Sequence, residues 1–149
     1  MSALAINLHR QHNTPVSAAG EVPNGYRVQN NRRRHMPVGA APYRGGNPDH
    51  ANPEQALAAA LSRCRMMNFL ALCTRPGGSL IGYRDHPEAD PGRKVPRKMS
   101  ITRTDPYPVL RPDTGFAIDA DQLAQTQHRE HRYCFIANSL ADSVETRVN

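Results

Sequence analysis

The chain has 149 residues, of which 38% are hydrophobic and 5% aromatic, so its length predicts one domain and its composition a small core. Its formal net charge of +6 is compatible with nucleic acid, an anionic substrate or a solvated basic surface, and decides among none of them. Three widely spaced cysteines exclude the disulfide framework of small secreted proteins, because such frameworks use even numbers of cysteines.

The N-terminal third is dominated by polar residues, proline and glycine. Residues 1–25 are polar and irregular in sequence, and we expect this segment to be poorly ordered. Residues 26–149 are expected to form a single domain. Proline and glycine recur through residues 37–52, which predicts a loop.

A long helix is predicted over residues 53–74. Asn52 is a good N-cap, Pro53 suits the first helical position and Gln55 can complete a capping box. Apolar residues then recur at helical spacing, and a Pro-Gly-Gly sequence ends the pattern. The recurring positions are Leu57, Leu61, Cys64, Met67 and Leu70–Ala71.

Short strands and a second helix are predicted after this point. Strands are expected over residues 80–84, 99–103 and 143–148, and a broken strand over residues 109–118. Residues 85–96 carry three prolines and are predicted to be loop. A helix capped by Asp119 or Asp121 is expected to run to about His131. Strands in runs, without strict alternation with helices, predict an α+β fold.

The most apolar stretch, residues 56–73, carries Arg63 and Arg65 near its middle. Charges at this position argue against a membrane span. The first residues also lack an apolar stretch of signal-peptide length. We therefore expect a cytoplasmic protein with no membrane partner, whose thiols stay free to react.

Two segments carry a specific pattern. The predicted helix begins Asn52-Pro53-Glu54-Gln55 and continues with Cys64-Arg65-Met66-Met67-Asn68, and the chain later contains Cys134-Phe135-Ile136-Ala137-Asn138-Ser139. Together these segments resemble the OsmC/Ohr family of thiol peroxidases, and the last is the most specific match. The resemblance implies a long central helix packed on an antiparallel sheet, in an intertwined homodimer.

The resemblance also implies roles for individual residues. Cys64 would be the peroxidatic cysteine and Cys134 the resolving cysteine. Glu54 would be the carboxylate of the site, and Arg32 its arginine, with Arg27 as the second choice. The implied function is reduction of organic hydroperoxides in oxidative-stress defence, without a cofactor or a metal. The implied partners are a second copy of the chain, the hydroperoxide and a dithiol reductant of the lipoyl type.

These residue types match what cleavage of a peroxide bond requires. A thiolate splits the O–O bond and an alkoxide leaves, so the attacking thiol must lose its proton near neutral pH. A guanidinium stabilises the thiolate and the developing alkoxide, and Glu54 would hold that guanidinium in orientation. Cys134 would then trap the sulfenic acid on Cys64 as a disulfide, which an outside dithiol reduces.

The spacing of Glu54 and Cys64 requires a second chain. Ten residues of helix separate them by roughly 15 Å and direct them to different faces. Two antiparallel copies could place Glu54 of one chain beside Cys64 of the other. The homodimer that the resemblance implies meets this requirement.

Several residues have simpler interpretations. Cys64 also fits as a small hydrophobe on the apolar side of its helix, and Cys73 is predicted to pack without a role in the site. Met66, Met67 and Phe69 are predicted core residues, of which one or two would line an apolar substrate pocket.

Two departures from the family pattern favour a second hypothesis, a catalytically degenerate relative. Arg65 stands where the family usually has histidine, and it could favour the Cys64 thiolate or face solvent. Pro106 and Pro108 interrupt a strand that the family keeps more continuous.

Two further alternatives are weaker. His128, His131 and Cys134, with Cys64, could make a metal site, but no CxxC pair accompanies them. The cluster of Arg27, residues 32–34 and His35 could contact phosphates, but it lacks interleaved aromatics and a known binding motif. We therefore expect neither a metal nor nucleic acid as a partner.

Overall fold

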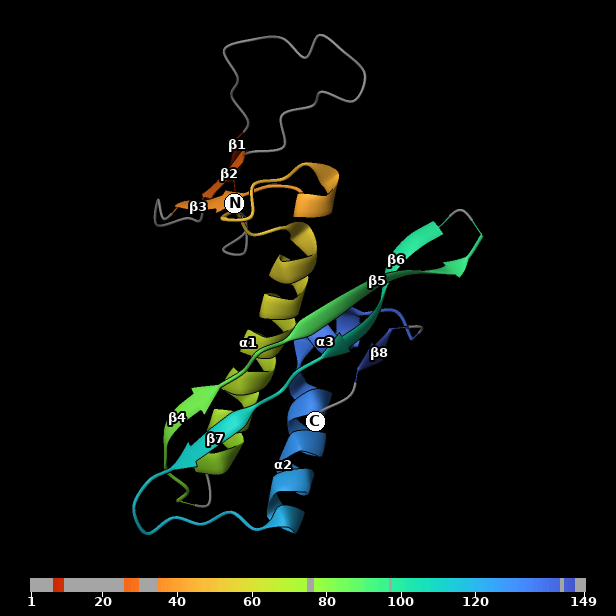
Figure 1. Ribbon diagram of the computed structural model, residues 1–149. Helices are drawn as coiled ribbons and strands as arrows, with labels where there is room; N and C mark the ends of the chain where they lie inside the picture. Colours follow the sequence, from red (N-terminus) through yellow and green to blue (C-terminus); the bar gives the residue numbers. More distant parts are fainter. Residues whose placement is uncertain are drawn as a thin grey trace, which may run out of the picture. The chain divides into compact units, whose positions relative to one another are not determined.

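The computed structural model describes residues 7–9, 26–29, 35–74, 77–96, 98–142 and 144–146. The chain divides into two compact units, residues 1–56 and residues 57–149. Helix α1 (Pro53–Thr74) contains the boundary between them (Figure 1).

The first unit contains a three-stranded antiparallel sheet in the order β1-β2-β3. Its strands are β1 (Asn7–His9), β2 (Tyr26–Gln29) and β3 (His35–Val38), followed by a short 3-10 helix, η1 (Pro42–Arg44). Strand β1 falls in the segment predicted to be poorly ordered, and β3 extends into the predicted loop over residues 37–52. The remaining residues before residue 26 lie outside the described part of the chain.

Helix α1 begins with the predicted capping box. The Gln55 backbone N–H donates to Asn52 Oδ1 at 2.8 Å, and the Asn52 N–H donates to Gln55 Oε1 at 3.0 Å. The helix ends at Thr74, and Gly77 then adopts a positive φ of 84°, which favours glycine. The predicted bounds of this helix are confirmed.

The buried face of α1 differs from the predicted apolar stripe. The buried side chains recur at spacings of three and four residues and are Ala58, Leu61, Ser62, Arg65, Phe69, Leu72 and Cys73. Of the predicted stripe only Leu61 is buried, whereas Met67 is 64% exposed and Cys64 is half-buried. The prediction chose the wrong face because it could not anticipate a buried arginine. Met67 is correspondingly not a core residue within this chain.

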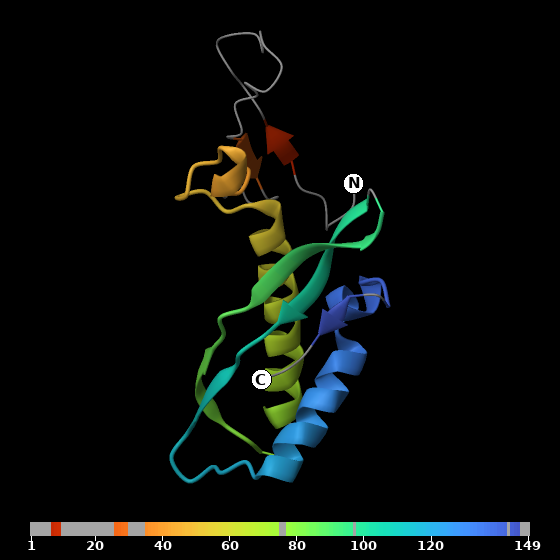
Figure 2. The same cartoon turned by 45° about the vertical axis from the view of Figure 1, so that its right-hand side comes forward.

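The second unit continues with β4 (Leu80–Arg84), β5 (Glu88–Val95), β6 (Lys98–Asp105), β7 (Val109–Pro112) and β8 (Glu145–Thr146). Strands β4 and β7 pair antiparallel, and a second sheet has the order β5-β6-β8. Within that sheet β5 and β6 are antiparallel, whereas β6 and β8 are parallel. Figure 2 shows β5 and β6 as a long twisted hairpin.

The prediction of a loop over residues 85–96 is wrong for most of this stretch, because β5 occupies it. Strand β5 tolerates Pro91 because it lies at an edge of its sheet, where a missing N–H leaves no neighbour unpaired. The pairing register with β6 also shifts between Asp90 and Pro91. The predicted break at Pro106 and Pro108 is confirmed, since β6 ends at Asp105 and β7 begins at Val109.

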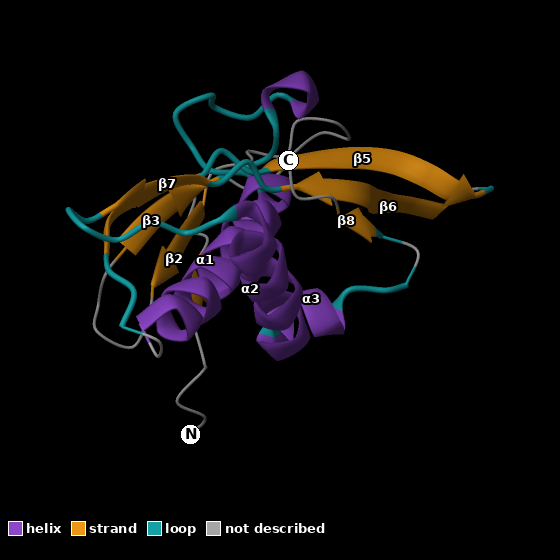
Figure 3. Cartoon of the chain, turned by 90° about the horizontal axis from the view of Figure 1, so that it is seen from below, coloured by secondary structure: helices purple, strands orange, loops and turns teal. Residues whose placement is uncertain are grey.

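Helices α2 (Ala120–Tyr133) and α3 (Phe135–Ser139) complete the second unit. Asp119 caps α2, and its side chain accepts the Gln122 backbone N–H at 2.7 Å. Within this unit α1 and α2 lie side by side, and with α3 they cover one face of the strand layer formed by β5, β6, β7 and β8 (Figure 3).

By length and composition alone, α1 could also cross a membrane. The core helix of a folded domain meets the same criteria. Arg65, near the middle of α1, is buried against Glu130 of α2, and this contact favours the core-helix interpretation.

Candidate thiol site

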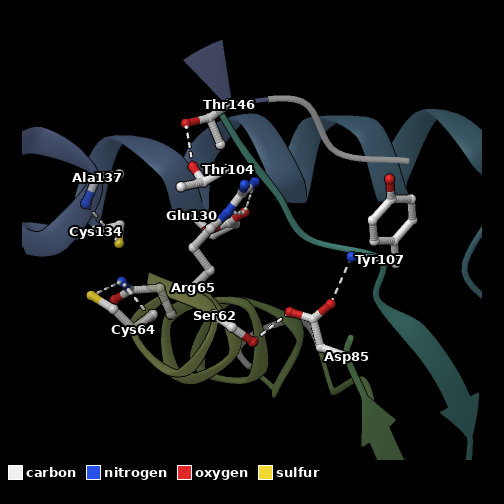
Figure 4. A network of polar contacts seen from close by, with 11 residues as sticks. Ser62, Cys64, Arg65, Asp85, Thr104, Tyr107, Glu130, Cys134, Ala137 and Thr146 are labelled. Carbon is white, nitrogen blue, oxygen red and sulfur yellow. Dashed lines mark hydrogen bonds and ion pairs between the residues drawn. The ribbon is translucent and has the colours of Figure 1, made fainter. Parts of the chain in front are cut away.

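Cys64 and Cys134 come from different elements and lie near each other. Cys64 lies in the middle of α1, and Cys134 ends α2 and caps α3. Cys64 is near enough to Cys134 to affect its pKa, and Figure 4 shows Cys134 across from Cys64. All three cysteines are free, and Cys73 is buried two turns further along α1. The structure therefore places near each other the two cysteines that the sequence singled out, and their roles stay predictions.

The two thiols differ in access to solvent. Cys64 is half-buried, whereas Cys134 is fully buried, with no exposed surface. Asn68, one turn after Cys64, donates its Nδ2 to the Cys64 carbonyl oxygen at 3.0 Å and lies 3.8 Å from Cys64 Sγ. Cys64 is therefore the more exposed residue of the two, and Asn68 supplies its sulfur with a hydrogen-bond donor.

Burial dominates the protonation of Cys134. Desolvation, with a smaller contribution from the neighbouring Cys64, raises the pKa of Cys134 to about 11. The Ala137 backbone N–H, which donates to Cys134 Sγ at 3.3 Å, opposes this shift. At neutral pH Cys134 is therefore a protonated thiol held beside a more exposed one.

A buried ion pair lies next to the thiols. Arg65 Nε and Nη2 donate to Glu130 Oε1 at 2.7 and 2.5 Å. Arg65 is 4% exposed and Glu130 is 3% exposed. The sequence left open whether Arg65 favours the Cys64 thiolate or faces solvent. Because Arg65 is buried, the solvent-facing alternative is wrong.

A polar network extends from the same face of α1. Ser62 donates its hydroxyl to Asp85 Oδ2, and the Tyr107 backbone N–H donates to Asp85 Oδ1 at 2.6 Å (Figure 4). Burial, with the carboxylates of Asp85 and Glu130, raises the pKa of Tyr83 to about 12. Asp85 thus ties α1 to the connections that flank β4 and β7.

Comparison with known proteins identifies the fold. No protein-family model and no curated protein matches the sequence, but solved structures do. An OsmC-like protein of unknown function from Vibrio cholerae matches with a TM-score of 0.90 at 22% identity, covering 100% of both chains. The chain adopts the OsmC fold.

Two further OsmC-fold structures match over most of their length. An organic hydroperoxide resistance protein OsmC from Legionella pneumophila has a TM-score of 0.72 at 11% identity, covering 99% of this chain and 97% of that one. An organic hydroperoxide resistance protein from Elizabethkingia anophelis, with thiocyanate bound, has a TM-score of 0.72 at 14% identity, covering 97% and 93%. The chain fold that the sequence resemblance implied is confirmed, and the intertwined homodimer stays a prediction.

Of the remaining predicted site residues, Glu54 and Arg27 lie in the first unit. Glu54 is half-buried in the first turn of α1. Arg27, in β2, is exposed, and Arg32 lies outside the described residues. The roles of Glu54 and of either arginine stay predictions.

The metal alternative has no geometric support in the described part of the chain. No three His, Cys, Asp or Glu side chains converge there as metal ligands. His128 and His131 are both exposed on α2.

Two residues of the site were missed in the sequence. Asn68 stands four residues after Cys64, a spacing that places both on one side of a helix and was available as a signal. Glu130 likewise stands four residues before Cys134, but nothing in the sequence links it to Arg65.

The raised pKa of Cys134 predicts how stability depends on pH. Its stabilising contribution is complete below the pKa of an unfolded cysteine, about 8.5, and is lost as pH rises toward 11. Between pH 8 and 10.5, wild type should lose about 2 kcal/mol relative to Cys134→Ala. Chemical unfolding of both proteins under reducing conditions measures their free energies of unfolding at each pH. The contributions of titratable groups that both proteins contain cancel in the comparison. If the stability of wild type relative to Cys134→Ala stays constant or increases as pH rises, Cys134 is not a buried, protonated thiol.

Proposed function

We propose that this OsmC-fold protein is a thiol peroxidase of the OsmC/Ohr type that reduces organic hydroperoxides in oxidative-stress defence. The observation that carries the proposal is the proximity of a partly exposed cysteine, Cys64, to a fully buried one, Cys134. This asymmetry suits a two-cysteine mechanism, because substrate reaches one sulfur while the other can react only with its neighbour.

In the first step the Cys64 thiolate attacks one peroxide oxygen. The O–O bond breaks, an S–O bond forms, and the leaving alkoxide takes up a proton to become an alcohol. Cys64 is now a sulfenic acid, oxidised by two electrons. Asn68, whose amide lies 3.8 Å from Sγ, donates toward the sulfur while it carries charge.

In the second step the Cys134 sulfur attacks the Cys64 sulfenic acid. The S–O bond breaks, the S–S bond forms, and the hydroxyl leaves with the Cys134 proton as water. A dithiol from solvent then reduces the disulfide by two exchange steps and is itself oxidised to a disulfide. We propose a lipoyl-type dithiol for this step and the cytoplasm as the compartment, because both thiols must return to the reduced state.

A second copy of the chain completes the proposed site. Beside its buried face, α1 carries a second face of small or apolar residues that this chain leaves partly open. This outer face comprises Leu57, Ala60, Cys64, Met67 and Ala71. Phe135, next to Cys134, is 82% exposed. Covering these residues with a partner would bury apolar surface and could bring the partner's Glu54 to Cys64.

Light scattering at micromolar concentration tests the homodimer. We expect twice the mass of the chain. A monomer at that concentration would contradict the shared site, since one helix holds its own Glu54 and Cys64 roughly 15 Å apart.

Peroxide consumption tests the function itself. Reduced protein is mixed with an alkyl hydroperoxide and a lipoyl-type dithiol, and the consumption of the hydroperoxide is followed. A parallel assay replaces the alkyl hydroperoxide by hydrogen peroxide. We expect turnover, with the alkyl hydroperoxide preferred because only it has apolar surface to bury near Met67 and Phe135. A folded, reduced dimer that turns over neither peroxide would instead be a degenerate relative of the peroxidases.

A further inference from the structure

We propose that the buried Arg65–Glu130 ion pair positions Cys64 and Cys134 for disulfide formation. The inference rests on the proposed function, in which these two thiols must form a bond. Arg65 and Glu130 act here as positioning residues: their role is to hold α1 and α2 in the one arrangement that brings the sulfur atoms together.

The first argument is where the pair lies along the two helices. Arg65 follows Cys64 directly on α1, and Glu130 stands one turn before Cys134 on the same side of α2. A shift of either ion-paired residue along or around its helix therefore moves a cysteine with it. The pair joins the two helices within one helical turn of the two cysteines, as Figure 4 shows.

The second argument is the direction of the contact. Arg65 binds Glu130 Oε1 through two nitrogens, Nε and Nη2, at 2.7 and 2.5 Å. Two donors converging on one oxygen restrict the guanidinium in angle as well as in distance. The apolar residues around it, such as Leu61 and Phe69, pack without directional preference and impose no such restriction.

The third argument is that a contribution to stability does not explain why this ion pair is buried. Both residues are almost fully buried, and neither Arg65 Nη1 nor Glu130 Oε2 has a hydrogen-bond partner among the described residues. Burying charges carries a desolvation penalty, and apolar side chains of similar volume are often equally stable or more stable in such places. Directional positioning is what the ion pair supplies and an apolar pair does not.

The chemistry of the second step explains why position matters. The S–S bond forms at about 2.05 Å with a restricted dihedral angle, and Cys134 is too buried to search for its partner. If resolution is slow, a second hydroperoxide can oxidise the Cys64 sulfenic acid to sulfinic acid, which leaves the cycle. The ion pair thus sets the competition between disulfide formation and overoxidation.

The test uses a double variant, Arg65→Met with Glu130→Leu, which keeps the volume and removes both charges together. Thiol exchange in a glutathione redox buffer measures how readily Cys64 and Cys134 form their disulfide, without any hydroperoxide. We expect wild type to form it at least tenfold, and up to about 100-fold, more readily than the double variant, since misplacement by about 1 Å has effects of this size. Sulfinic acid on Cys64, measured by mass spectrometry after hydroperoxide treatment, should rise in parallel.

Two further variants make the result decisive. Arg129→Met removes an exposed arginine next to Glu130 on the same helix and should behave as wild type. Arg65→Lys keeps the charge but replaces the guanidinium fork by a single ammonium. Its disulfide should form less readily than that of wild type and more readily than that of the double variant. If the double variant fails to fold, Arg65→Lys serves as the test in its place.

The inference is overturned if the folded double variant, or Arg65→Lys in its place, forms the disulfide as readily as wild type. It is also overturned if wild type forms no Cys64–Cys134 disulfide in an oxidising buffer. A wild type that forms the disulfide but consumes no hydroperoxide would refute the proposed function alone, and the variants would still report on positioning.

Discussion

Replacing Cys64 by serine is expected to abolish hydroperoxide turnover, with a fall of about 10³-fold or more. A serine hydroxyl stays protonated at neutral pH and is a far weaker nucleophile than a thiolate. Cys64 is also the accessible member of the thiol pair, so the buried Cys134 cannot take over the first step. Peroxide consumption with a lipoyl-type dithiol measures the change.

Cys73→Ser is the control for Cys64→Ser. Cys73 is buried on the same helix, where burial raises its pKa above the ordinary value. We expect this variant to keep wild-type turnover once its fold has been verified by circular dichroism. Equal losses in the two variants, or turnover that survives in Cys64→Ser, would contradict the assignment of Cys64 as the nucleophile.

Removing the proposed charged partners of Cys64 should have the next largest effect. Glu54→Gln and Arg32→Ala are each expected to lower turnover by about 10²–10³-fold, the range for losing one charge-assisted contact to a developing oxyanion. Gln keeps the shape of Glu54, so the dimer should persist. Steady-state kinetics of both variants, with light scattering as a check on assembly, measure the effect.

Neighbouring arginines serve as matched controls for Arg32. Arg33→Ala should leave turnover unchanged, because one guanidinium suffices for the site. If Arg27→Ala is damaging and Arg32→Ala is silent, Arg27 is the site arginine and the choice of Arg32 is wrong. If Glu54→Gln has no effect in an intact dimer, the shared site itself is wrong.

The sequence predicted best what local chemistry determines. The helix over Pro53–Thr74 followed from its cap, Asn52, and from the Pro-Gly-Gly sequence after it, and Asp119 similarly marked the start of α2. The pairing of Cys64 with Cys134 followed from the family resemblance, because no local pattern connects residues 70 positions apart.

What the sequence did not predict depends on tertiary contacts. The buried face of α1 was misassigned because Arg65 is charged, and only Glu130 on another helix makes its burial tolerable. Strand β5 was missed because Pro91 normally disfavours a strand, and only its place at a sheet edge removes that penalty. In both cases the deciding feature is the tertiary surroundings of the residue, which its local sequence does not specify.

The central claim is that Cys64 and Cys134 form one redox pair, and peptide mapping tests it most directly. Trypsin cleaves after Arg63, Arg65 and Arg132, so each of the three cysteines falls in a separate peptide. Reduced protein is treated with one equivalent of an alkyl hydroperoxide, its remaining thiols are alkylated, and its peptides are identified by mass spectrometry. We expect a Cys64–Cys134 disulfide and alkylated Cys73. A disulfide that includes Cys73, or three alkylated cysteines after the hydroperoxide has been consumed, would contradict the account.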